Sequence, residues 1–135
     1  MKTDAELWVF AAGSILAGLA VVLGAFGAHA LKASVSQEML GTFETGVRYQ
    51  MYHGLGLLAL AWAIHAWPER RLAPAAWMLL AGTLVFSGSL YLLVLTGGRW
   101  LGAVTPVGGV ASTGGWALVV WRLLVNRRHA ETTSF

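Results

Sequence analysis

Residues 7–28 read LWVFAAGSILAGLAVVLGAFGA, a run of 22 residues without one ionisable side chain. A helix needs about 20 apolar residues to cross a hydrocarbon core of about 30 Å. Lipid offers the backbone no hydrogen-bonding partner, so such a run can cross the core only as a helix. The stretch therefore predicts a transmembrane helix at roughly residues 6–29.

Three more uncharged runs follow along the chain, with lengths of 20, 27 and 22 residues. Each run is long enough for a membrane crossing. The corresponding helices are expected at roughly residues 48–67, 74–96 and 102–125. The sequence therefore predicts an all-α fold, a bundle of four transmembrane helices that forms one integral membrane domain over residues 1–135.

The composition agrees with a membrane protein and excludes several other classes. Hydrophobic residues make up 57% of the chain and charged residues 11%, whereas a soluble domain carries roughly 25% charged residues. The nine lysines and arginines lie at the ends of the apolar runs, which is typical of contact with lipid headgroups, so nucleic acid is not an expected partner. The chain has no cysteine, which excludes disulfides, thiolate catalysis and iron–sulfur clusters.

The cations also predict an orientation. Three of them belong to the side that holds the connections between the first and second and between the third and fourth helices. Six belong to the side of the two termini: Lys2, Arg70, Arg71, Arg122, Arg127 and Arg128. The positive-inside rule then places both termini in the cytoplasm.

The first run has one alternative interpretation, a cleaved signal peptide. Ala28-His29-Ala30 follows an apolar stretch in the manner of a signal-peptidase site. The stretch is longer than the 7–15 residues of a signal core, and Asp4 and Glu6 oppose the positive charge that should precede it. A retained transmembrane helix is therefore the expectation.

The segment before the second run predicts a further helical element. Ser34 and Gln37 match a capping box, and apolar residues recur at helical spacing from residue 39 onward. A helix from residue 35 to residue 66 would be about 48 Å long, which exceeds the hydrocarbon thickness. We therefore expect a short interfacial helical segment before the second transmembrane helix, with a bend near Gly41 or Gly46.

Small residues predict where helices pack closely. The first run carries Gly13, Ala17, Ala20 and Gly24 on one face, and the fourth carries Gly108, Gly109, Ser112, Thr113 and Gly115. Such faces let two helix backbones approach each other, although the same space could admit a ligand. Pro106 either starts the fourth helix or kinks it, because proline has no N–H to donate.

Polar side chains gather in one half of the predicted bundle. If the chain crosses the membrane four times, polar groups from all four helices lie at the end where the first helix finishes. Within the third helix, Thr83, Ser87 and Tyr91 form a polar stripe at four-residue spacing. Glu44 and Arg48 have the favourable order for a helical ion pair. The candidate ligand-binding residues are His29, Glu44, Arg48, Tyr49, His53, Ser87, Tyr91 and Thr105. The cluster is either a site for a polar or amphiphilic ligand or a hydrogen-bond network that fixes the helix register.

These residues do not identify a cofactor or a reaction. His29 and His53 lie at the same end but show no metal-ligand spacing, so no metal is expected and no cofactor can be named. No nucleophile accompanies them in a catalytic arrangement, so the protein is not expected to be an enzyme.

Four ordered stretches resemble a known family. Residues 24–31 (GAFGAHAL), 43–53 (FETGVRYQMYH), 86–91 (FSGSLY) and 102–109 (GAVTPVGG) resemble the signatures of the domain-of-unknown-function 423 family, also called transmembrane protein 256-like. The resemblance implies a small multi-pass protein of the bacterial inner membrane, with relatives in eukaryotes. It implies no established activity and no catalytic residues.

Two functions follow as expectations. The first is a structural, accessory or assembly subunit that works in the lipid bilayer as a homo-oligomer or within a larger membrane complex. The second is a binding module for a lipid, quinone or other amphiphile at the polar cluster.

Overall fold

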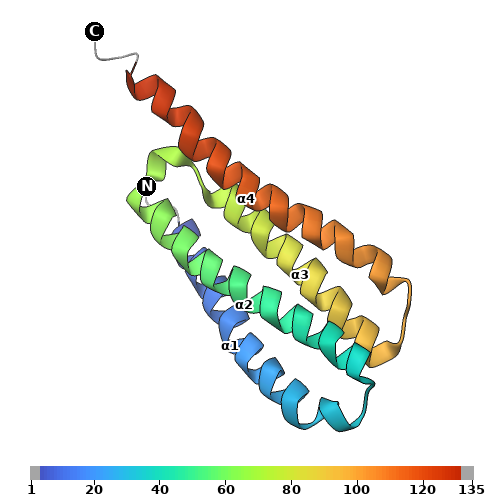
Figure 1. Cartoon of the computed structure of the whole chain (residues 1–135). Helices are drawn as coiled ribbons and strands as arrows, with labels where there is room; N and C mark the ends of the chain where they lie inside the picture. The colour runs from blue at the N-terminus through green and yellow to red at the C-terminus, as the bar shows by residue number, and fades with distance from the viewer. Residues whose placement is uncertain (1–3, 132–135) are drawn as a thin grey trace.

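The computed structural model describes residues 4–131, and side chains up to residue 125. Within these residues the chain is all-α, with four long helices joined by short connections (Figure 1). The helices are α1 (Ala5–His29), α2 (Gln37–Ala66), α3 (Ala73–Thr96) and α4 (Leu101–Glu131), and the 3-10 turns are η1 (Leu31–Ala33) and η2 (Pro68–Arg70). Among the cations used to predict orientation, Lys2 and the side chains of Arg127 and Arg128 lie outside the described part.

The helix ends have local causes that the sequence partly predicts. The cap of α2 is Ser36 and not Ser34, since the Ser36 hydroxyl accepts a hydrogen bond from the Met39 N–H at 3.2 Å. Ser34 instead ends η1, where its own N–H donates to Leu31 O. Gly97 caps α3 after its last residue, Thr96, and its φ of 71° is the left-handed conformation that glycine adopts freely at a helix end.

Two expectations for the helix interiors are refined. Pro106 lies inside α4, five residues after its first residue Leu101, so it does not start that helix. The predicted segment before residue 48 is helical, but it is the first part of one continuous helix, α2. Its Leu40 and Phe43 pack with Leu31 and with Val94 near the end of α3.

The four helices are arranged as a row in which neighbours along the chain are neighbours in space. Helix α1 packs on α2, α2 on α3, and α3 on α4 (Figure 1). Within the described residues α4 makes no backbone contact with α1. Helix α1 begins at the same end of the molecule as α4 finishes, and the α2–α3 connection lies at that end too (Figure 1).

Glycine sets the distance between neighbouring helices. A Cβ atom at Gly13 in α1 would lie 2.7 Å from the carbonyl oxygen of Gly54 in α2. A Cβ atom at Gly82 in α3 would lie 2.5 Å from the Ser112 nitrogen in α4. Because real Cβ atoms do not approach backbone atoms so closely, these pairs mark helix crossings that admit no side chain, as the small-residue faces predict.

The outer faces are apolar. Exposed side chains on α1 include Leu7, Phe10 and Val21, and those on α4 include Val110 and Leu124. Continuous apolar surface of this extent indicates contact with lipid rather than water. Among the residues that the structure describes, three segments are long and apolar enough to cross a membrane: Ala5–Ala33, Ala73–Thr96 and Leu101–Val125.

Helix α2 has a different character from the other three. It carries Glu38, Glu44 and Arg48 in its first half, and it is the helix between α1 and α3 in the row. Its Gly46, Gly54 and Gly56 face the neighbouring helices, and its Gln50 is buried between them. Helix α2 therefore lies between two helices, where polar side chains such as Gln50 find protein partners.

Candidate functional site

The polar stripe of α3 forms the seam between α3 and α2. Ser87 is buried, and its hydroxyl donates to the carbonyl oxygen of Gly46 on α2 at 2.7 Å. A Cβ atom at Gly46 would lie 2.8 Å from a ring carbon of Tyr91. The predicted spacing of Thr83, Ser87 and Tyr91 thus places all three against α2, one turn apart.

One residue that the sequence interpretation left out of the site, Gln50, connects three helices. The Tyr91 hydroxyl donates to Gln50 Oε1 at 2.8 Å, and Gln50 Nε2 donates to the carbonyl oxygen of Leu16 on α1 at 2.9 Å. Gln50 is 5% exposed. Its position, four residues from both Gly46 and Gly54, is the signal that would have placed it on the packed face of α2.

His53 occupies the next turn of the same seam. Its Nδ1 lies 2.9 Å from the Thr83 hydroxyl, and that hydroxyl donates to Leu79 O at 2.7 Å. A hydroxyl has one proton to give, so His53 Nδ1 is the donor in this pair. The neutral imidazole then has Nε2 as an acceptor.

Thr105 takes part in a separate contact between α3 and α4. Its hydroxyl lies 2.6 Å from that of Ser89. Ser89 was not among the candidates. It stands between Ser87 and Tyr91 in the sequence, but it faces α4, whereas they face α2. Thr105 is therefore paired with its neighbouring helix and is not joined to the α2–α3 seam by any hydrogen bond within the described residues.

The remaining candidates lie toward the surface. His29, Glu44 and Arg48 are exposed, and within residues 4–125 none of them makes a side-chain hydrogen bond or ion pair. Tyr49 is 42% exposed, with its ring 5.1 Å from that of Phe86 and 6.2 Å from that of His53. The eight candidates thus divide into an interhelical network and an exposed group.

A cavity of about 120 Å³ lies between α2, α3 and α4 beside this network. Tyr49, His53 and Phe86 line it on one side, and Ser112 and Trp116 of α4 line it on the other. The Ser112 hydroxyl is buried and has no hydrogen-bond partner among the described residues. At roughly 30 Å³ per water molecule, the cavity holds about four water-sized groups.

The side chains around the cavity can bind a polar group. His53 Nε2 can accept a hydrogen bond, and the Ser112 hydroxyl can donate or accept one. The described residues contain no group of three or more histidines and carboxylates that could hold a metal ion. A small hydroxyl or carbonyl group surrounded by aromatic rings is the kind of occupant that these side chains suit.

Comparison with known proteins gives relatives without a known activity. Residues 23–109 match the family described as protein of unknown function (DUF423). The UPF0382 membrane protein YwdK of Bacillus subtilis is 45% identical over 109 residues, covering 80% of this chain and 89% of the relative. The UPF0382 inner membrane protein YgdD of Escherichia coli is 41% identical over 122 residues, covering 87% of this chain and 88% of the relative. No solved structure shows significant similarity.

Proposed function

Because the chain belongs to the DUF423 family, whose relatives are membrane proteins, we propose that it is an accessory or assembly subunit of the bacterial inner membrane. The observation that carries the proposal is the hydrogen-bonded chain from Tyr91 through Gln50 to Leu16 O. It uses these polar side chains to join α1, α2 and α3. A narrow row of helices joined in this way is suited to holding another membrane protein in position.

We propose that all four helices cross the membrane with both termini in the cytoplasm. Helix α2 is about 45 Å long, so its first turns extend past the hydrocarbon into the headgroup layer. This places Glu38, Glu44 and Arg48 where water can reach them, in line with the exposure of these side chains. The rest of α2 contains no Asp, Glu, Lys or Arg.

Native mass spectrometry tests the accessory role. The full chain carries an affinity tag and is extracted with its surrounding lipid, so that partners are not stripped. The expected result is a complex of fixed stoichiometry, either with another membrane protein or with further copies of the chain. A bare single chain at all extraction conditions would contradict the proposal.

The cavity beside His53 supports a second candidate, a binding site for the polar head of a quinone, a lipid or another amphiphile. The buried Ser112 hydroxyl without a protein partner is the observation that favours it, since an unpaired buried polar group costs free energy. A volume of about 120 Å³ suits a headgroup and not a whole amphiphile.

Retention of a small molecule distinguishes this candidate from the first. A site at the cavity predicts a stoichiometric small-molecule adduct that Ser112→Ala weakens. Ser14→Ala makes the same substitution at an exposed serine of α1 that does not line the cavity, and it should retain the adduct at wild-type level. An adduct that both variants retain equally would place the ligand elsewhere.

A further inference from the structure

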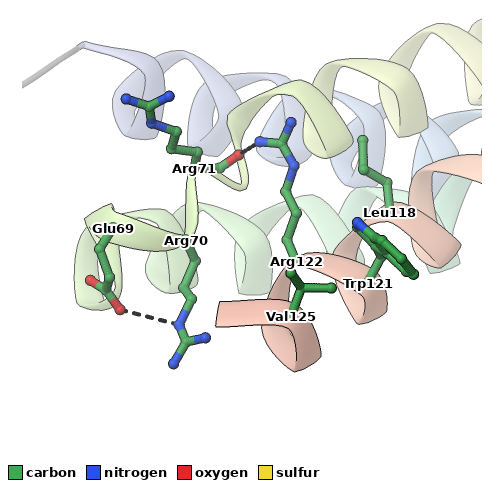
Figure 2. A pocket seen from close by; sticks show the side chains of 7 residues that line it. All are labelled: Glu69, Arg70, Arg71, Leu118, Trp121, Arg122 and Val125. Carbon is green, nitrogen blue, oxygen red and sulfur yellow. Dashed lines mark hydrogen bonds and ion pairs between the residues drawn. The ribbon is translucent and has the colours of Figure 1, made fainter. Parts of the chain in front are cut away.

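A second cleft lies at the other end of the molecule from the polar network. It is formed by the α2–α3 connection and the last described turns of α4, and its volume is about 570 Å³ (Figure 2). Arg70, Arg71 and Arg122 form its basic wall, together with Glu69. Its other wall consists of Leu118, Trp121 and Val125 of α4.

Arg70 holds the connection against α4. Its Nη1 donates to the Leu123 carbonyl oxygen at 3.1 Å, and its Nε donates to Glu69 Oε1 at 3.2 Å. The Arg70 side chain is 20% exposed. Among the described residues that line the cleft, three are arginines and one, Glu69, is a carboxylate, which forms an ion pair with Arg70 (Figure 2).

Arg122 and Arg71 have guanidinium groups that still have N–H donors to offer. Arg122 Nη1 donates to the carbonyl oxygen of Arg71, which uses one of its five N–H groups. The Arg71 guanidinium has no partner among the described residues, and Figure 2 shows it extending from the connection on the side opposite to Arg70. Guanidinium groups with unused N–H donors are suited to the oxygens of a phosphate group, which they can bind in bidentate fashion.

The backbone beneath these side chains is unusual. Arg71 has φ 50° and ψ 49°, and within the described residues it is the one non-glycine residue with a positive φ. This left-handed conformation is unfavourable for an L-residue, because its Cβ atom approaches the following carbonyl oxygen. It turns the Arg71 carbonyl oxygen toward Arg122 and so orders the basic wall.

The opposite wall is suited to the remainder of an amphiphile. Trp121 is 66% exposed, and tryptophan is enriched at the depth of the lipid headgroups. Leu118 lies one turn from Trp121 toward the middle of α4. A molecule that fills both walls is therefore charged at one end and apolar along its length.

We propose that this cleft binds the phosphate of an anionic phospholipid in the leaflet at the α2–α3 end of the protein. Basic pockets beside helix ends recognise anionic lipid headgroups in this way. Three arginines against one carboxylate in the described lining disfavour a zwitterionic lipid, because its ammonium group would lie near guanidinium groups. The site is independent of the accessory role and of the cavity beside His53.

Native mass spectrometry of the delipidated full chain in detergent measures the binding. Three probes are compared: phosphatidylglycerol, phosphatidylethanolamine and inorganic phosphate. The expected result is a one-to-one phosphatidylglycerol adduct that forms in clear preference to the phosphatidylethanolamine adduct, while millimolar inorganic phosphate displaces little of it. Phosphate displacing the lipid completely would identify a soluble anion as the occupant and overturn the assignment.

Matched variants locate the site. Arg71→Gln and Arg122→Gln should each weaken phosphatidylglycerol binding about fivefold. Arg99→Gln makes the same charge change in the connection at the opposite end and should leave binding unchanged. Equal binding of the two lipids by the wild-type chain, or an equal loss in all three variants, would show that the cleft does not select an anionic lipid. The wild-type comparison holds even if Arg122→Gln fails to fold.

Discussion

Tyr91 and Gln50 illustrate how a single side chain acts in this protein. The Tyr91 hydroxyl donates to one partner, Gln50, whereas the Gln50 amide meets two, the Tyr91 hydroxyl and the Leu16 carbonyl oxygen. In a membrane the alternative to such a partner is an unsatisfied polar group, but interhelical hydrogen bonds in membrane proteins contribute only about 0.6 kcal/mol on average. The effect of losing one is therefore expected to be modest and measurable.

Removal of the Tyr91 hydroxyl tests this network. Tyr91→Phe should lower the free energy of unfolding by about 1 kcal/mol, because the Gln50 carbonyl loses its donor while remaining buried. In the Gln50→Leu background the same change should cost less, since no partner is left unpaired. Unfolding in mild detergent measures both. Tyr52→Phe removes the same atom from an exposed tyrosine and should have no effect, and an equal loss there would contradict the assignment.

Arg48 provides the opposite case. It is exposed and has no ion-pair partner within residues 4–125, so Arg48→Leu should change the free energy of unfolding by less than about 0.5 kcal/mol. Glu44→Leu/Arg48→Leu should behave in the same way. A large loss in the single variant that the double variant restores would instead reveal a buried pair. Unfolding of the three proteins under one set of conditions decides this.

At the scale of helices, the positions of charges and small residues predict where helices begin and end and which helix faces pack together. The charged ends of the apolar runs predict α1 and α3 to within one residue at each end. The four-residue spacing of Thr83, Ser87 and Tyr91 predicts one shared face, because the helical period is nearly four. The role of Gln50 and the arginine cleft depend on which helix lies opposite, and that information is not contained in either helix alone.

Glycine at the α3–α4 crossing gives a prediction for a pair of helices. A Cβ atom at Gly82 would meet backbone atoms of α4, whereas one at Gly88, on the same helix, would meet nothing within 4 Å. Gly82→Ala should therefore lower the free energy of unfolding by about 1–3 kcal/mol through overpacking. Gly88→Ala should leave it unchanged or raise it, since alanine favours a helix. Comparable destabilisation by both substitutions would show that helix propensity, and not the crossing, controls this position.

At the scale of the whole molecule, the row arrangement gives the polar side chains of α2 protein partners on two sides. Helices α1 and α4 stand at the two ends of the row and expose apolar faces, while α2 has a neighbour on each side. A helix with two protein neighbours can carry polar side chains that a lipid-facing helix cannot. Hydropathy alone therefore does not decide whether α2 crosses the membrane. The number of crossings is for this reason the most informative property to measure.

The chain has no cysteine, so single cysteines report its topology directly. Four crossings with cytoplasmic termini predict that Ser34→Cys and Gly98→Cys react with an impermeant thiol reagent in intact cells. Glu69→Cys and Ser134→Cys should react only after the membrane is permeabilised. If α2 instead lay along the surface, the positions at its two ends, 34 and 69, would react from the same side. If all four positions reacted in the opposite way, four crossings would still hold but the termini would lie outside the cytoplasm. The number of crossings and the orientation are separate claims, because only the positive-inside bias assigns which side is the cytoplasm.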